Sequence, residues 1–158
     1  MVKMELDFRK AKEGDCRLLF EWANDPVVRR SSFNSVAIEY DDHVRWFNGK
    51  LHDASARLLL FYDDEAPAGL ARFEKGEAGI EIHFTVAPEY RGRGVGTEII
   101  QIGVEYCKTE WPGEKLVAHV KDDNEASIKI FERAGFINDG YVQFKGGKCL
   151  RFSVVLNG

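Results

Sequence analysis

The apolar residues of this chain follow two periods, one typical of strands and one typical of helices. Apolar and polar side chains alternate through residues 80–86, and apolar residues then recur at helical spacing from Val95 to Tyr106. We expect strands at residues 6–11, 57–62, 67–74, 80–86 and 115–120, with a terminal pair formed by 136–137 with 141–144 and by 148–156. We expect helices at residues 16–22 and 41–51, from 95 to the stop at Trp111-Pro112-Gly113, and at 125–133.

Turn and cap residues mark the ends of these elements. Asp15 is placed to cap the first helix, Asn124 to cap the last one, and Gly135 takes the usual C-terminal glycine position after it. Asn24-Asp25-Pro26 ends or kinks the first helix, and residues 27–38 are polar and irregular. The first fifty residues therefore predict one strand and two helices.

The order of these elements predicts the fold class. A helix connects the strands at 80–86 and 115–120, which gives a βαβ-like unit, whereas the neighbouring strands are joined by short turns. We expect an α+β (α/β) fold, with a mixed, mostly antiparallel twisted sheet of about seven strands and helices on both faces. With 158 residues the chain fits a single domain, 1–158.

Composition and charge narrow the range of functions. A net charge of −4 argues against a nucleic-acid partner and mildly favours a cationic substrate such as an amine. We expect no membrane association, and residues 1–7 lack a secretory signal pattern, so a cytoplasmic protein is expected. Three cysteines without C-x-x-C spacing indicate neither a disulfide framework nor a metal site.

A glycine-rich loop, Arg91-Gly92-Arg93-Gly94-Val95-Gly96-Thr97, lies between the strand at 80–86 and the helix that follows it. Amides at a helix N-terminus favour phosphate, and the glycines allow a ligand to approach closely. Arg91 and Arg93 can neutralise an anion directly. The loop fits neither a Walker loop, which ends in Gly-Lys-Ser/Thr, nor the dinucleotide fingerprint, which needs glycine where Thr97 stands. The sequence thus predicts a diphosphate site, with a plain glycine turn as the alternative.

Residues 86–96 resemble the acetyl-CoA loop of the GNAT superfamily of N-acetyltransferases, whose pattern is Gln/Arg-x-x-Gly-x-Gly/Ala. Arg91, Gly94 and Gly96 occupy its three fixed positions. Residues 123–136 are similar to the family's Asn-x-x-(Ala/Ser)-x-x-x-(Tyr/Phe)-x-x-x-Gly-Phe helix. The two blocks stand in the family's order and separation, and the resemblance implies the GNAT fold over nearly the whole chain.

The resemblance also implies roles for individual residues, with acetyl-CoA as co-substrate and no metal. The loop amides from Gly92 to Thr97 would hold the pyrophosphate, and the pantetheine arm would pair with the strand end at Thr85 and Val86. Asn124 would hydrogen-bond the arm from the other side, and a helix cap alone is its alternative role. The same block places Ser127 and Phe131 beside the cofactor.

Acetyl transfer needs a neutral nitrogen, a stabilised oxyanion and a proton for the thiolate. Glu81 and His83 share a face of the strand that leads to the loop, so either is a candidate base; His43 and His119 are more distant candidates, and a solvated strand face is the alternative. In the family a backbone amide near Val86 would meet the oxyanion. The family's usual thiolate-protonating tyrosine is replaced by Phe131. Candidate acids are therefore Tyr141, then Tyr90 or Tyr106, with solvent as the alternative because a thiol pKa is about 8.5.

Residues 22–29, 31–35 and 43–47 resemble segments of PseH-type enzymes, which N-acetylate a UDP-linked 4-amino-4,6-dideoxy sugar; a related stretch occurs in RimJ/RimL-type enzymes. The expected substrate contacts combine polar groups for a diphosphate with rings for stacking: Arg29, Phe33, Asn34, Ser35, His43 and Trp46. A plain surface loop is the alternative. The first candidate acceptor is the amino-sugar nucleotide, followed by a protein N-terminus or a polyamine, and the alternative of another class is a silent coenzyme A sensor. We expect a monomer or a homodimer.

Overall fold

The computed structural model describes residues 5–157, so Met1–Met4, which belong to the segment searched for a secretory signal, lie outside the described residues. Seven strands of the described part form one sheet in the order β1-β2-β3-β4-β5-β7-β6. The strands are β1 (Asp7–Lys10), β2 (Ala56–Asp63), β3 (Ala66–Lys75), β4 (Ile80–Val86), β5 (Lys115–Val120), β6 (Ile137–Phe144) and β7 (Gly147–Val155). Neighbours are antiparallel except β4 and β5, which confirms the predicted mixed sheet.

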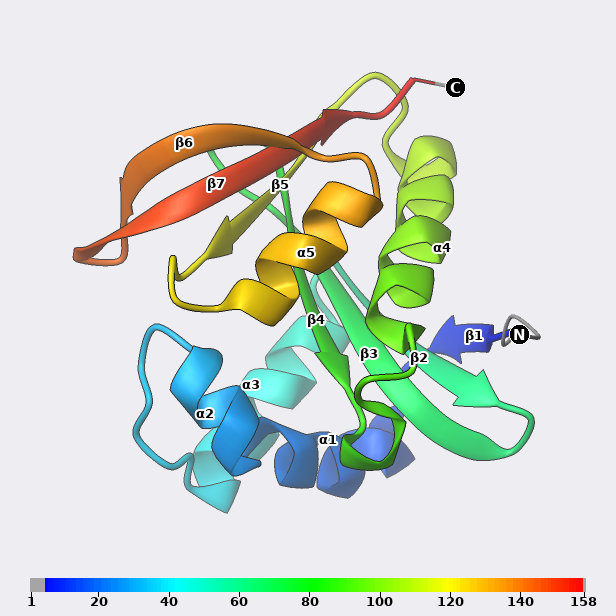
Figure 1. Cartoon of the computed structure of the whole chain (residues 1–158). Helices are drawn as coiled ribbons and strands as arrows, with labels where there is room; N and C mark the ends of the chain where they lie inside the picture. The colour runs from blue at the N-terminus through cyan, green and yellow to red at the C-terminus, as the bar shows by residue number, and fades with distance from the viewer. Residues whose placement is uncertain (1–4, 158) are drawn as a thin grey trace.

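Helices cover both faces of this sheet. They are α1 (Cys16–Ala23), α2 (Pro26–Ser31), α3 (Tyr40–Leu51), α4 (Val95–Glu110) and α5 (Glu125–Arg133), with short 3-10 helices η1 (Glu13–Asp15) and η2 (Pro88–Tyr90). Figure 1 shows α4 and α5 in front of the sheet, and α3 contacts β2 behind it. Residues 58–61 of β2 are all buried, as strands covered on both faces require. No helix in the described part is long and apolar enough to cross a bilayer.

The prediction for residues 27–38 was wrong in its first part, because α2 occupies Pro26–Ser31. Asp25 caps this helix by accepting hydrogen bonds from the amides of Val27 at 3.0 Å and Val28 at 3.4 Å. Pro26 fits the first helical position, where no amide hydrogen is needed. Asn24-Asp25-Pro26 therefore ends one helix and begins the next, and the sequence prediction recognised only the first event.

Asp15 precedes α1 as predicted, but its side chain does not cap that helix. The carboxylate instead accepts two hydrogen bonds from Arg9, at 2.7 and 2.9 Å, and one from the amide of Lys12 at 2.8 Å. A guanidinium offers charge-assisted, bidentate bonds that a single helix amide cannot match. The predicted capping role of Asp15 is therefore corrected to an anchor between β1 and the turn before α1.

The parallel strands β4 and β5 separate soon after they begin. They pair at Ile80 with Leu116 and at Glu81 with Val117, whereas β4 stays paired with β3 to its end and β5 with β7. From residue 82 onward the edge of β4 that faces β5 has no strand partner in the described part. This opening in the middle of the sheet positions the site.

Candidate active site

A cavity of about 1260 Å³ opens where β4 and β5 separate. We call its two regions the loop end and the helical end. The loop end is lined by loop residues, the strand end and α5, namely Thr85, Val86, Arg91, Gly92, Gly94, Val95, Gly96, Thr97, Asn124, Ser127 and Phe131. The helical end is lined by residues of α1, α2 and α3, the loop after α2, and the sheet, among them Arg29, Phe33, Asn34, His43, Trp46, Arg72 and His83. One cavity thus joins most of the predicted site residues.

Four predicted site residues are not part of its lining. Arg93 lies beside the loop with its guanidinium 4.8 Å from the centre of the Tyr90 ring. Ser35, Glu81 and Tyr141 also lie outside the lining, and Glu81 borders it through His83 and His119. The sequence patterns located the cavity but did not decide which side chains face it.

The backbone of the loop has the conformation that glycine favours. Gly92 and Gly94 have φ angles of 74° and 78°, and Gly94 is the N-cap of α4. A Cβ atom on Gly96 would lie 2.7 Å from Ile130 Cδ1, so this glycine allows α4 to approach α5 closely. The first amides of a helix have no partner within it, and the helix dipole makes their surroundings favourable for an anion. The loop end therefore offers backbone donors to a phosphate.

Both arginine side chains of the loop have partners within the chain. Arg91 Nη2 donates to Asp25 Oδ2 at 2.6 Å, and Arg93 lies over Tyr90, whose hydroxyl donates to Asp63 at 2.9 Å. Burial acts to raise the pKa of Asp25, but hydrogen bonds from Arg91 and the α2 amides outweigh it and hold that pKa below its ordinary value. The loop therefore offers its backbone amides to an anion, and the nearby positive charges of Arg91 and Arg93 support the same site.

Asn124 combines the two roles considered for it. Its Oδ1 accepts a hydrogen bond from the amide of Ser127 at 3.2 Å, which caps α5, and the residue also lines the cavity opposite the end of β4. The cap uses the side-chain oxygen and leaves the amide hydrogens as possible donors to a ligand. The capping role is confirmed, and the cofactor contact stays a prediction.

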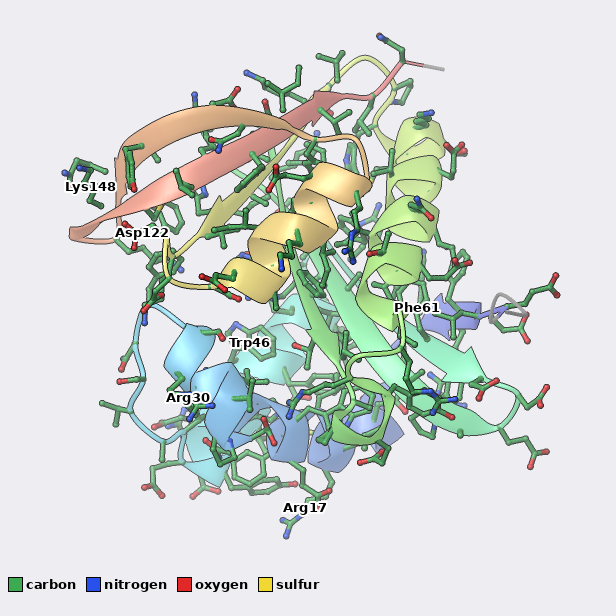
Figure 2. All side chains as sticks on the ribbon, viewed as in Figure 1. Arg17, Arg30, Trp46, Phe61, Asp122 and Lys148 are labelled. Atoms are coloured by element: carbon green, nitrogen blue, oxygen red, sulfur yellow. The ribbon has the colours of Figure 1, made fainter. Side chains whose placement is uncertain are left out.

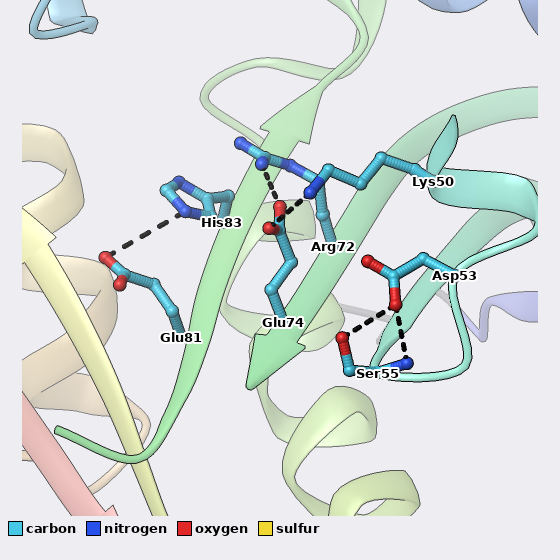
Figure 3. A network of polar contacts seen from close by, with 7 residues as sticks. All are labelled: Lys50, Asp53, Ser55, Arg72, Glu74, Glu81 and His83. Atoms are coloured by element: carbon cyan, nitrogen blue, oxygen red, sulfur yellow. Dashed lines mark hydrogen bonds and ion pairs between the residues drawn. The ribbon is translucent and has the colours of Figure 1, made fainter. Parts of the chain in front are cut away.

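Polar side chains on β4 and β5 meet beside the helical end. His119 Nδ1 lies 2.7 Å from Glu81 Oε1. His83 Nε2 lies 4.0 Å from the same oxygen (Figure 3). The His119 ring stacks on Phe144 with 3.8 Å between ring centres. Burial, followed by the positive charges of Arg72 and Lys145, lowers the pKa of His83 well below 6.5. His83 is therefore uncharged at neutral pH.

A second polar network forms one wall of the helical end. Glu74 forms ion pairs with Arg72 and with Lys50, the latter at 2.7 Å (Figure 3). The guanidinium of Arg72 lies 5.2 Å from the centre of the Trp46 ring, and Figure 2 shows Trp46 in the region between α2 and α5. This wall holds an aromatic ring and a cation next to each other.

Residues of the helical end that were predicted to contact the substrate also contact other residues of the chain. Arg29 donates to the carbonyl oxygens of Ala23, Asn34 and Val36 at 2.7, 2.9 and 3.1 Å, so its guanidinium fixes the loop that follows α2. Phe33 of this loop contacts the Phe144 ring edge-on at 5.4 Å. Arg29 thus shapes the cavity wall, and direct contact with a substrate stays a prediction.

His43 is buried on α3, and its Nε2 has no hydrogen-bond partner within the described residues. The rings of Trp46 and Phe47 lie 5.6 and 6.1 Å away, and burial lowers its pKa, so the imidazole is uncharged at neutral pH. His43 thus contributes to the lining of the helical end, and direct contact with a substrate stays a prediction.

The family model of the acetyltransferase (GNAT) domain matches residues 5–137, which is most of the chain. The chain belongs to the GNAT acetyltransferase family. The family and fold predicted from the two sequence blocks are confirmed, and with them the enzyme class of an N-acetyltransferase dependent on acetyl-CoA.

Relatives of this GNAT chain include a spermidine acetyltransferase and an acetyltransferase whose name states no acceptor. It is 22% identical over 145 residues to spermidine N(1)-acetyltransferase from Vibrio cholerae, covering 89% of this chain and 84% of the relative. It is 26% identical over 140 residues to the acetyltransferase PseH from Campylobacter jejuni, covering 86% and 85%. A crystal structure of the Vibrio cholerae spermidine enzyme with CoA and spermine has the same fold, with a TM-score of 0.84, 21% identity and coverage of 96% and 95%.

Phe131 stands where the family commonly has a tyrosine that protonates the thiolate, and the structure places the alternative acids. Phe131 is 2% exposed and packs edge-on against Phe84 at 5.6 Å. Tyr141 is exposed and donates to Asp122 at 3.2 Å, away from the cavity. Tyr106, whose pKa is raised to about 12 by burial and the adjacent Glu110, also lies outside the lining. Of the three tyrosines considered, Tyr90 lines the cavity, and its hydroxyl donates to Asp63.

The sequence analysis missed Phe144 and Lys145. Lys145 lines the cavity next to the helical end, and Phe144 contacts both His119 and Phe33. Gly146-Gly147 marked a turn, but nothing in the local pattern shows that this hairpin reaches across β5. Within residues 5–157, no group of three or more His, Cys, Asp and Glu side chains is arranged to hold a metal ion.

Proposed function

We propose that this GNAT enzyme transfers the acetyl group of acetyl-CoA to the primary amine of a small anionic acceptor, with the 4-amino group of a UDP-linked amino-deoxy sugar as first candidate. The observation that carries the proposal is the single cavity that connects the loop of α4, the opening between β4 and β5, and the helical end. A diphosphate site at one end and an aromatic, cationic wall at the other allow two substrates to meet beside His83.

In the proposed acetyl-CoA site, the binding groups are mainly backbone groups at the head of α4 and at the end of β4. Amides at the head of α4, from Gly92 to Thr97, would take the diphosphate of coenzyme A. Beyond Glu81 the edge of β4 that faces β5 pairs with no strand of residues 5–157, so its amides and carbonyls up to Val86 are available to the amide groups of a pantetheine arm. Asn124 faces this edge from α5 and supports the same arm.

The reaction follows from the groups around the opening. A base on β4, Glu81 or His83, takes a proton from the acceptor nitrogen, which then attacks the thioester carbonyl. A backbone amide near Val86 stabilises the oxyanion. The C–N bond forms and the C–S bond breaks, and solvent protonates the thiolate because Phe131 carries no hydroxyl. A thiol pKa of about 8.5 makes this last step easy near neutral pH.

The charges of the helical end favour an acceptor that carries an anionic group. Arg72 and Lys145 line this end of the cavity. The negative charge of Asp42 is paired with Arg45, and that of Glu125 lies at the N-terminus of α5, where the helix dipole offsets it. Although the whole chain is slightly acidic, the local field at this end is positive. A nucleotide-linked amino sugar meets these cations with its diphosphate and meets rings such as Trp46 with its sugar or base.

A polyamine is the second candidate, because spermidine N(1)-acetyltransferase is among the relatives at similar identity. A polycation requires carboxylates near the transferred group, and the pair of Glu74 with Lys50 and Arg72 leaves little negative charge for it. A protein N-terminus remains the third candidate acceptor. The alternative outside the enzymes is a coenzyme A sensor without catalytic activity. Phe131 motivates it, because this side chain has no hydroxyl to protonate the thiolate.

The test is release of free thiol from acetyl-CoA in the presence of a UDP-linked 4-amino-4,6-dideoxy sugar, spermidine, or a peptide with a free N-terminus. We expect saturation with the sugar nucleotide and weak, unsaturated rates with the other two. Saturation with spermidine instead would overturn the acceptor assignment. Coenzyme A binding in calorimetry without thiol release from any amine would identify a sensor. Replacing Arg93 and Gly94 should raise the KM for acetyl-CoA, and an unchanged KM would contradict the loop assignment.

A further inference from the structure

Two histidines from neighbouring strands reach one carboxylate oxygen. Glu81 is the last β4 residue that pairs with β5, and His83 and His119 lie just beyond the point where the strands separate. His119 Nδ1 is 2.7 Å from Glu81 Oε1, and His83 Nε2 is 4.0 Å from it. Where the strands separate, both imidazoles therefore lie near the same oxygen of the Glu81 carboxylate.

The position of the proton on His119 follows from this contact. A carboxylate oxygen only accepts, so the nitrogen at 2.7 Å carries hydrogen, and His119 acts as donor. Its ring is 6% exposed at the side chain and lies parallel to Phe144, with an interplanar angle of 4°. The stack fixes the ring plane, and the hydrogen bond fixes the orientation of the Glu81 carboxylate.

The orientation of Glu81 in turn favours one tautomer of His83. Nε2 is the nitrogen nearer the carboxylate, and although 4.0 Å exceeds a hydrogen bond, the electrostatic attraction favours hydrogen on Nε2 and a lone pair on Nδ1. His83 lines the cavity, whereas Glu81 does not. Of the two candidate bases on β4, the imidazole alone presents an atom to an acceptor.

We propose that His83 is the catalytic base, that Glu81 orients it and balances its charge, and that His119 is the positioning residue that holds Glu81. This inference rests on the proposed acetyltransferase function and decides between its two candidate bases. Positive or titratable groups face His83 from several elements: Arg72 on β3, Lys50 on α3, Lys145 on the β6–β7 turn and the imidazole of His119 on β5. The carboxylate of Glu81 is the adjacent negative group.

The acceptor ammonium gives one proton to Nδ1 of His83, and the freed electron pair forms the C–N bond as the C–S bond breaks. The imidazolium keeps its Nε2 hydrogen directed at Glu81, which stabilises the positive charge. The nitrogen loses its second proton to solvent, and solvent protonates the departing thiolate. His83 then returns its proton to water. No oxidant or reductant is needed.

The first test needs no acceptor. Two-bond ¹H–¹⁵N correlation spectra of the full chain report which nitrogen of each histidine carries hydrogen. We expect hydrogen on Nδ1 of His119 and on Nε2 of His83, with His83 uncharged at pH 7. Hydrogen on Nδ1 of His83, or a charged ring at pH 7, would overturn the proposal. This readout is independent of whether the proposed acceptor is correct.

The second test uses acetyl-CoA with the UDP-linked amino sugar. His83→Gln keeps a donor near the Nε2 position but has no basic nitrogen, so kcat should fall by about 100-fold or more with the KM for acetyl-CoA little changed. Glu81→Gln should lower kcat less than His83→Gln does. The reverse order would assign the base to Glu81. If the unaltered enzyme does not turn over the sugar nucleotide, only the acceptor assignment fails. The tautomers of His83 and His119 then decide whether the roles proposed for His83, Glu81 and His119 are correct.

Two substitutions of His119 separate its donor from its stacking. His119→Asn keeps a nitrogen donor near the Nδ1 position and loses the stack on Phe144, whereas His119→Phe keeps the stack and loses the donor. We expect kcat of the asparagine variant to exceed that of the phenylalanine variant by about five-fold or more, and the tautomer of His83 to change in the latter alone. Equal activities, or the opposite order, would show a purely structural role.

Discussion

Arg91 of the glycine loop donates to Asp25, a residue 66 positions earlier in the chain, over 2.6 Å. The same carboxylate caps α2 through the amides of Val27 and Val28. Because Arg29 of α2 fixes the loop that lines the helical end, one ion pair connects the two ends of the cavity. A displacement of Arg91 or Asp25 would therefore change the geometry of both the loop end and the helical end.

Replacing Asp25 by asparagine should tighten coenzyme A binding. Asparagine keeps a capping oxygen, but removes a negative charge near the expected diphosphate and frees Arg91 to approach it. We expect the Kd of coenzyme A in calorimetry to fall by about two- to five-fold at low salt, on the order of a few tenths to one kcal/mol. Asp25→Ala is the control that also loses the cap, at about 1 kcal/mol of stability. A ten-fold weaker Kd for Asp25→Asn would mean that the ion pair positions Arg91 for binding.

Gly94→Ala tests the left-handed backbone of the loop. A Cβ at Gly94 meets no atom within 4 Å, but its φ of 78° is unfavourable for alanine by roughly 1–2 kcal/mol. We expect a several-fold higher KM for acetyl-CoA and a lower free energy of unfolding in urea.

The matched control is Gly49→Ala on α3, where the added methyl also meets no atom within 4 Å and φ is ordinary. This substitution should raise the free energy of unfolding by about 0.4–1 kcal/mol and leave the KM unchanged. Similar effects of Gly49→Ala and Gly94→Ala would show that the loop needs no special conformation.

Lys145→Gln should move the acidic limb of the pH–rate profile to higher pH. Burial and then the cations around His83 lower its pKa, so removal of one cation raises it. A base must be uncharged to accept a proton, and activity is lost as the pH falls through its pKa. We expect the limb of kcat/KM, measured between pH 5 and 8, to move toward 6.5.

Lys148→Gln controls for the loss of one charge in the same hairpin. Lys148 lies over the exposed Tyr141 ring at 4.2 Å, near the hairpin tip and away from Trp46 in Figure 2. Its profile should match that of the unaltered enzyme. A downward shift for Lys145→Gln would contradict the charge argument.

Tyr141→Phe should leave kcat within about two-fold, although the sequence made Tyr141 the first candidate acid. Its hydroxyl donates to Asp122 outside the cavity, and the bond to that carboxylate raises its pKa, which weakens it further as an acid. Steady-state rates with acetyl-CoA check this expectation. A hundred-fold loss would restore Tyr141 as the acid and would require the β6–β7 hairpin to move toward the cavity.

The sequence determined features that depend on neighbours within a few residues. The period of two placed β4, the glycine run placed the start of α4, and Asn124 was recognised as a cap, because strands, helix ends and turns are set by local backbone preferences. The two family blocks added the GNAT fold. The helix α2 was not predicted, because the cap by Asp25 and the favourable position of Pro26 were interpreted only as the end of α1.

The tertiary structure alone decided which side chains meet. Arg91 finds Asp25, and His119 finds Glu81, across 66 and 38 positions of sequence, and no local period encodes such distances. Phe144 of β6 stacks on His119 of β5 although β7 lies between these strands in the sheet, so the contact does not follow from strand pairing. Local preferences fix each element separately, whereas the burial shared by the whole sheet and its helices fixes their order and separation, and the site lies where two strands part.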